Sequence, residues 1–191
     1  LQKYKLSSMH RYIFHISSET PRKNVDGLIR AFYQLKAKPG FSNLKLLKAG
    51  NPQYQKDRKK LLSLIRQLNL QEEIIFLDYV PAKDLPELYN VAELFVFPSF
   101  YEGFGLPVLE AMASGCPVVC SSATSLPEVG GDAVLYAAPR SPAELATQIK
   151  RVLDSRDLQE ELRERGKRRA AEFSHKRYAA ELIGIYEEVA S

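Results

Sequence analysis

The chain has 191 residues, of which 45% are hydrophobic and 26% are charged, and its formal net charge is +4. This length and composition are typical of a globular protein with one domain and a full hydrophobic core. No apolar run reaches the ~18 residues that a transmembrane helix requires. The mild positive charge permits an anionic small-molecule ligand without demanding nucleic acid.

Short apolar runs alternate with amphipathic segments from residue 12 onward. Apolar residues that recur every three or four positions predict helices, and short continuous apolar runs predict buried strands. Strands are expected at 12–16, 44–49, 74–77, 94–97, 117–120 and 133–136. Helices are expected at 25–35, 54–69, 84–91, 106–114, 142–154, 157–172 and 174–190. Residues 1–11 are polar and show no period, so we expect them to be a linker from a segment upstream.

This alternation predicts an α/β fold in which helices cover both faces of a parallel sheet. The best match is a Rossmann-like, doubly wound sheet of about six strands in the order 3-2-1-4-5-6. In such a sheet, ligands bind outside the carboxyl ends of the strands, at the point where the strand order reverses. The first and fourth strands flank that point. Unusual loops follow both of them, at 17–24 and 99–106, so a ligand site is expected between these loops.

The loop after the fourth strand is the most informative segment of the chain. Glu102 and Glu110 have seven residues between them, and between these acids a glycine-rich turn opens into the next helix. Gly103 and Gly105 can take backbone angles that other residues avoid, and Pro107 suits the first position of a helix. Free amides at a helix start, with the helix dipole behind them, can bind a diphosphate. The amides expected there are those of Phe104, Gly105 and Leu106.

The two acids suit two different sugars. Glu110 lies about one turn into the helix, where a carboxylate would repel phosphate but could hold a neutral diol such as a ribose. Glu102 precedes the helix and suits the hydroxyls of a second sugar, and its charge could favour a cation-like transition state at the anomeric carbon. Lys23 or Arg22 could reach across from the other loop to neutralise the diphosphate. Each feature alone is more often structural, because a Gly-x-Gly turn is commonly only a tight connection, but together they favour a site.

The cysteines and the charged runs indicate no second site. Cys116 and Cys120 have three residues between them, which is not a metal-ligand spacing, so we expect buried free thiols in a reducing cytosol. The charged run at 163–169 lies in a predicted helix and is expected to be a solvated face rather than a nucleic-acid-binding surface. The same is expected of Lys56, Arg58, Lys59 and Lys60.

The sequence from 102 to 119 closely resembles the two-glutamate signature of retaining GT-B glycosyltransferases of family four, the glycosyl transferases group 1. Residues 121–131 resemble the loop that follows this signature, residues 21–25 resemble the family's phosphate-binding loop, and residues 78–81 resemble its base-contacting loop. The resemblance covers about residues 12–190, and its central motif is highly specific.

The resemblance implies a role for each candidate residue. Glu110 would bind the ribose, and Glu102 would contact the donor sugar and assist catalysis. Ser18 would lie at the donor where many members have an arginine, so neutralising the diphosphate would rest on Lys23, with Arg22 as a substitute. The other donor-binding residues would be Tyr79 and Val80 near the base, and Gly103, Phe104, Gly105 and Leu106 at the diphosphate.

The family implies a two-domain enzyme. Residues 12–191 match only its C-terminal, donor-binding half, with 174–190 as the helix that crosses to the N-terminal domain. The whole enzyme would transfer a mannose- or glucose-type hexose from a GDP or UDP sugar to a glycan or lipid-linked acceptor in polysaccharide biosynthesis. This fragment alone would be inactive.

The resemblance also implies partners and a location. The partners would be the nucleotide sugar, the missing domain and, through the last helix, a second copy of the chain. No metal, other cofactor or nucleic acid would be needed, and the enzyme would lie in the cytoplasm at the inner face of the membrane. Two alternatives stay open: a nucleotide-sugar epimerase of GT-B architecture, against which the two-glutamate segment argues, and a non-catalytic nucleotide-sugar-binding module.

Overall fold

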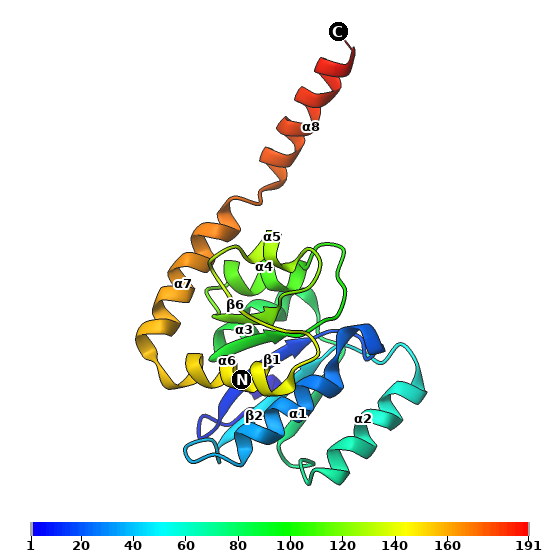
Figure 1. Cartoon of the computed structure of the whole chain (residues 1–191), viewed down its shortest axis with the longest axis vertical. Coiled ribbons are helices and arrows are strands. Elements are labelled where there is room, and N and C mark those ends of the chain that lie inside the picture. Colours follow the sequence, from blue (N-terminus) through cyan, green and yellow to red (C-terminus); the bar gives the residue numbers. More distant parts are fainter. Residues whose placement is uncertain (1, 191) are drawn as a thin grey trace.

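A computed structural model describes residues 2–190 of the chain. Its centre is a sheet of six parallel strands in the order β3-β2-β1-β4-β5-β6. Helices lie around this sheet (Figure 1). The predicted strand order and the doubly wound α/β class are therefore confirmed. The strands are β1 (Arg11–Ile16), β2 (Leu44–Ala49), β3 (Ile74–Asp78), β4 (Leu94–Phe97), β5 (Val118–Ser121) and β6 (Leu135–Ala137).

The helices follow the predicted order, with some displaced boundaries. Strand β6 begins at Leu135, two residues later than expected. An additional helix, α5, occupies part of the segment 121–131, because Leu126 and Val129 bury their side chains there. The α-helices are α1 (Val25–Lys36), α2 (Gln55–Gln67), α3 (Leu85–Val91), α4 (Leu106–Ala113), α5 (Leu126–Gly130), α6 (Pro142–Asp154), α7 (Arg156–Ala171) and α8 (His175–Ala190). Short 3-10 helices are η1 (Gln2–Tyr4), η2 (Pro21–Lys23) and η3 (Ala82–Asp84).

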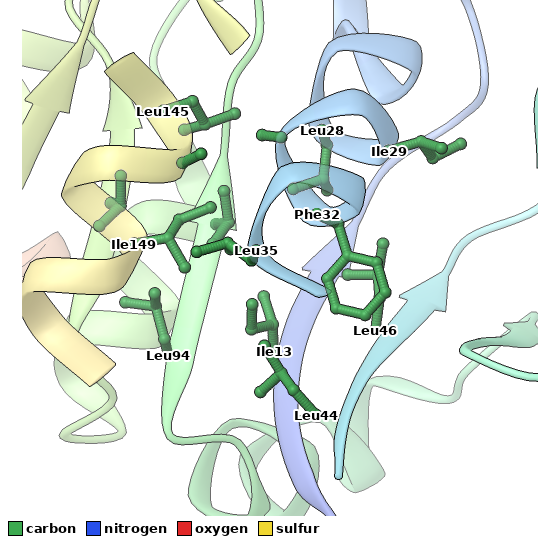
Figure 2. Close-up of a cluster of buried hydrophobic side chains, with 14 of the residues drawn as sticks. Ile13, Leu28, Ile29, Phe32, Leu35, Leu44, Leu46, Leu94, Leu145 and Ile149 are labelled. Atoms are coloured by element: carbon green, nitrogen blue, oxygen red, sulfur yellow. The ribbon is translucent and has the colours of Figure 1, made fainter. Parts of the chain in front are cut away.

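Helices α1, α2 and α6 cover one face of the sheet. Side chains alternate between the two faces of a strand, so every second apolar residue of β1 and β2 points toward these helices. Each large aliphatic side chain buried in this way stabilises the fold by ~1.5–3 kcal/mol. Figure 2 shows this cluster, in which Leu28, Phe32 and Leu35 of α1 and Leu145 and Ile149 of α6 pack with Ile13, Leu44, Leu46 and Leu94 of the strands.

Helices α3, α4 and α5 cover the opposite face. At its centre the Tyr89 ring of α3 lies 5.2 Å from the rings of both Phe14 in β1 and Phe95 in β4, in edge-to-face contact. Because both faces are covered, β1 and β4 are buried on two sides. The loops at their carboxyl ends therefore start from rigid positions.

The amino-terminal segment is more ordered than the sequence pattern indicates. The Tyr4 hydroxyl donates a hydrogen bond to Asp84 at 2.7 Å, and Leu6 is buried against the core. The backbone amide of Ser7 donates to the Tyr12 hydroxyl at 2.9 Å. This segment packs on the domain, while its role as a linker to another domain stays a prediction.

The last two helices differ in their contacts. Helix α7 packs against α4, where Gly166 comes so close that a side-chain carbon at this position would lie 3.3 Å from Met112. Helix α8 extends away from the sheet beyond the end of α7 (Figure 1). Its exposed apolar side chains include Tyr178, Ile183 and Tyr186. Among the described residues, no helix is both long and apolar enough to cross a membrane.

Candidate functional site

The loops after β1 and β4 meet at the centre of the sheet. These strands are neighbours, with Ile13 paired to Leu94. Between the loops, the Phe100 amide donates to the Arg22 carbonyl at 2.7 Å. The Asn24 side chain donates to the carbonyls of Pro98 at 3.0 Å and Pro139 at 2.8 Å. The two loops that were expected to flank a ligand site are thus in direct contact.

Asn24 lies in the predicted loop 21–25, but its role in joining the two loops was not predicted. It is buried and has a φ of 54°, which lies in the left-handed region. Apart from glycine, asparagine is one of the few residues that adopt this conformation readily. It stands just before α1, so its conformation turns the chain from η2 into that helix. An asparagine directly before a helical pattern was the available signal.

The glycine-rich turn delivers unpaired amides to the start of α4. Gly105 has a φ of +106°, which strains other residues, and a side-chain carbon there would lie 2.6 Å from the Leu126 side chain, so glycine is strongly favoured. The helix begins at Leu106, which places Pro107 second rather than first. Within residues 2–190, no hydrogen bond is found from the amides of Phe104, Gly105 or Leu106. These amides remain available for an anion at the positive end of the helix dipole.

The backbone of Glu102 is held at the junction by the hydroxyls of Thr124 and Ser125. Its backbone amide donates to the Thr124 hydroxyl at 3.0 Å, and the same hydroxyl donates to the Glu102 carbonyl at 3.0 Å. The Ser125 hydroxyl lies 3.0 Å from the carbonyls of both Glu102 and Phe104. These two hydroxyls carry no sequence signal, because nothing in a threonine and serine pair about 20 residues away marks it as a partner of this loop.

The side chain of Glu102 pairs with both candidate phosphate-binding cations. Lys23 Nζ lies 2.6 Å from Glu102 Oε1, and an Arg22 guanidinium nitrogen lies 3.5 Å from Oε2. Glu102 and Lys23 are nearly buried, whereas Arg22 is about half exposed. The structure therefore brings the three charged residues together, and one positive charge is left over to attract an anion.

Glu110 lies on the exposed side of α4, one turn after the unpaired amides. Its Oε2 accepts a hydrogen bond from the Tyr89 hydroxyl at 3.0 Å. Burial and the adjacent Glu110 charge raise the pKa of Tyr89, so this phenol stays protonated and acts as the donor. The carboxylate is thus partly oriented and still open to solvent, as a hydroxyl-binding group must be.

The residues proposed to contact a base differ in accessibility. Tyr79 follows β3 and is 71% exposed, whereas Val80 is 8% exposed and belongs to the core beside α3. Only the backbone of Val80 is therefore in a position to meet a ligand. Ser18 lies in the loop after β1, with its hydroxyl 3.2 Å from that of Thr20. Among residues 2–190, no described contact joins Ser18 to Lys23, Arg22 or Glu102.

A charge network centred on the buried residues Glu19 and Lys48 supports the first loop. The Arg58 Nε lies 2.8 Å from each carboxylate oxygen of Glu19, and another nitrogen of the same guanidinium lies 2.7 Å from Asp78. Lys48 donates to three backbone carbonyls at the ends of β1 and β2. The solvated face predicted at 56–60 is therefore wrong for Arg58, since its partner Glu19 is buried and requires a counter-charge.

One histidine and both cysteines of the sheet layers are buried. His15 has no exposed surface, and burial, with the nearby Lys48 charge, lowers its pKa to about 3. The free thiols of Cys116 and Cys120 are buried as predicted, and burial raises the pKa of Cys116 to about 12. Among residues 2–190, no three or more histidine, cysteine or acidic side chains are grouped to hold a metal ion.

Comparison with known proteins places this geometry in a family. The sequence model of the family described as glycosyl transferases group 1 matches residues 1–169. The chain belongs to this family. It is 41% identical over 186 residues to the O-antigen chain mannosyltransferase B of Escherichia coli, covering 97% of this chain and 48% of that protein. It is 33% identical to an α-(1→4)-mannosyltransferase of Mycolicibacterium hassiacum, covering 94% of this chain and 43% of that protein.

Solved glycosyltransferase structures share the fold. Sucrose-phosphate synthase of Thermosynechococcus elongatus superposes with a TM-score of 0.87 at 26% identity, over 100% of this chain and 48% of that one. A glycosyltransferase of Rickettsia africae gives a TM-score of 0.89 at 21% identity, over 100% of this chain and 50% of that one. This family member thus spans about half the length of each of these four relatives.

Proposed function

We propose that this chain is the donor-binding half of a retaining glycosyltransferase that uses a nucleoside diphosphate sugar. The observation that carries the proposal is the junction of the two loops. This junction lies at the topological switch point, where the strand order reverses and α/β sheets bind ligands. It brings together the charged side chains of Lys23, Arg22 and Glu102. The unpaired amides of Phe104, Gly105 and Leu106 belong to the same loop as Glu102.

The diphosphate would be bound by charge and by oriented amides. The amides before α4 would receive its oxygens, and the ammonium of Lys23 would turn from Glu102 to the phosphate, assisted by Arg22. When the bond to the sugar breaks, negative charge grows on the leaving diphosphate. These preorganised donors would stabilise that charge, so the positive groups supply electrostatic catalysis without a metal ion.

The two acids would divide the donor between them. Glu110, exposed on α4, would accept hydrogen bonds from the ribose hydroxyls. Glu102, clamped by Thr124 and Ser125, would meet the hydroxyls of the transferred sugar. Its negative charge would also favour the positive character that develops at the anomeric carbon in the transition state.

Mannose is the hexose that the relatives favour. Both sequence relatives described above are named mannosyltransferases, so we propose a mannose donor carried by GDP or UDP. A glycan or lipid-linked acceptor would be bound by an N-terminal domain that the chain does not contain. We also propose that the whole enzyme works in the cytoplasm at the inner membrane face, and that α8 contacts the N-terminal domain or a second copy.

Titration of this chain with GDP, UDP and ADP by calorimetry tests the donor site. We expect weak binding of GDP or UDP and no sugar transfer by the chain alone. Glu110→Ala should weaken the preferred nucleotide by ~1.5–3 kcal/mol, the range for a lost hydrogen bond to a charged group. Glu160→Ala, which removes an exposed acid from α7, is the matched control and should leave binding unchanged. Failure to bind any of the three nucleotides would refute the proposal.

A further inference from the structure

Tyr89 has no part in the proposed function, yet it contacts one of the two acids directly. Its hydroxyl lies 3.0 Å from Oε2 of Glu110 and 3.3 Å from the carbonyl of Pro107, which is in the same helix. We propose that Tyr89 is a positioning residue that holds the Glu110 carboxylate in the orientation that binds the ribose. This inference rests on the proposed function, because it requires Glu110 to be the ribose ligand.

The position of the Tyr89 hydroxyl is fixed by the core. The side chain is 1% exposed, and its ring lies edge-to-face against both Phe14 and Phe95. Close packing of this kind restricts a buried ring to one side-chain conformation. The hydroxyl therefore emerges from the hydrophobic layer at a set point beside the first turns of α4.

Glu110 has no comparable anchor of its own. It is exposed on α4, and its carboxylate ends a chain of three rotatable bonds. Within residues 2–190, the Tyr89 hydroxyl is the single polar group found in contact with this carboxylate. A carboxylate that is already oriented loses less conformational freedom when a diol binds, and the affinity for the diol rises accordingly.

The hydrogen bond leaves enough acceptor capacity for a sugar. A carboxylate has about four lone-pair positions on two oxygens, and Tyr89 occupies one of them on Oε2. Oε1 and the remaining positions on Oε2 can accept from two neighbouring hydroxyls. The phenol thus orients the plane of the carboxylate without blocking the ribose.

The inference predicts an effect on ribose recognition and not on nucleotide binding in general. Calorimetry would measure the affinities of two ligands. The first is whichever of GDP and UDP binds more tightly, and the second is the 2′,3′-dideoxy form of that nucleotide, which lacks both ribose hydroxyls. Tyr89→Phe should weaken the ribonucleotide about three- to tenfold, the effect of losing one ordered side chain. Binding of the dideoxynucleotide should change by less than about twofold. The affinity ratio, defined as the affinity for the ribonucleotide divided by the affinity for the dideoxynucleotide, should therefore fall.

Two controls separate positioning from stability. Tyr12→Phe removes a hydrogen-bonded phenol from the same core layer, at the amino end of β1, and should leave the affinity ratio unchanged. In a Glu110→Ala background, Tyr89→Phe should cause no further loss of ribonucleotide affinity, because the two residues act through one interaction.

The outcomes distinguish this inference from the proposed function. If Glu110→Ala lowers the affinity ratio and Tyr89→Phe does not, the inference is overturned while the ribose role of Glu110 stands. If Glu110→Ala also leaves the ratio unchanged, Glu110 does not bind the ribose, and both statements about it fall. A lower ratio in Tyr89→Phe alone and in Glu110→Ala, with no additional loss in the double variant, supports both.

Discussion

At the scale of single residues, the main feature is the contact between Lys23 and Glu102. At 2.6 Å, the ammonium and carboxylate satisfy each other in a nearly buried setting, where an unpaired charge would destabilise the fold. A diphosphate would compete with Glu102 for the same ammonium. The strength of phosphate binding should therefore depend on how firmly Glu102 holds Lys23.

Substituting each partner should change nucleotide affinity in opposite directions. Glu102→Gln removes the competing charge, so nucleoside diphosphate binding should tighten about two- to fivefold. Lys23→Met removes the cation and should weaken binding at least about tenfold, as expected for a charge-assisted hydrogen bond. Calorimetry measures both, and weaker binding by Glu102→Gln would contradict the competition. In the whole enzyme, Glu102→Gln should also lower sugar transfer.

Residue identities in the site were partly predictable from the sequence. Lys23, Arg22 and Glu102 could be expected to meet, because their loops follow neighbouring parallel strands. Their mutual pairing could not be predicted, since it depends on side-chain geometry across 79 residues of sequence. The contact of Tyr89 with Glu110 has no sequence signal at all, because a tyrosine in a helix is most simply a core residue.

At the scale of elements, the turn into α4 depends on one glycine. Gly105 has a left-handed φ of +106° and no room for a side chain beside Leu126, whereas a carbon added to Gly103 would meet nothing within 4 Å. These two glycines of the same turn therefore differ in what they require. The difference offers a matched pair of substitutions.

Gly105→Ala should destabilise the domain by ~1–3 kcal/mol, because the backbone strain of a left-handed alanine adds to the clash with Leu126. It should also displace the neighbouring amides and weaken diphosphate binding. Gly103→Ala should leave the free energy of unfolding within ~0.5 kcal/mol. Urea unfolding monitored by circular dichroism measures both variants. Equal stability of the two would contradict the role of the left-handed turn.

Elements with a clear period were predicted well, and short ones were not. The helix at 25–35 has apolar residues at regular steps and appears as α1 with a boundary shift of one residue. Helix α5 has only five residues, which is too short to show a helical period, so the sequence predicts a loop there. Its formation depends on burying Leu126 and Val129 in the finished core, which is a tertiary effect.

At the scale of the whole molecule, the buried His15 makes stability depend on pH. Its pKa falls from 6.5 to about 3 in the folded state, chiefly because burial disfavours the charged ring, with Lys48 and Lys23 adding repulsion. Below pH 6.5 the unfolded chain takes up a proton that the folded chain refuses until about pH 3. Stability is therefore lost as the pH falls through this range.

His15→Gln should flatten this acid dependence. Below pH 6.5, His15 should lower the wild-type free energy of unfolding by at most about 1.4 kcal/mol for each pH unit that the pH falls. The variant should lack this contribution. Urea titrations at a series of pH values between 4.5 and 7 give the slope directly. The slope, rather than the absolute stability, is compared because the variant also loses the bond to the Val96 carbonyl. An unchanged slope would show that His15 is not responsible.

One contact at the end of α7 has a mechanical consequence. The Phe173 ring lies 5.8 Å from the Phe104 ring, nearly perpendicular to it, and the Arg169 guanidinium lies 4.8 Å from Phe173 on the same helix end. Phe104 belongs to the turn into α4, and Phe173 precedes the protruding α8. Because Phe173 joins the start of α8 to the turn into α4, we expect a partner that reorients α8 to shift the position of Phe104 and, with it, the turn that carries the unpaired amides.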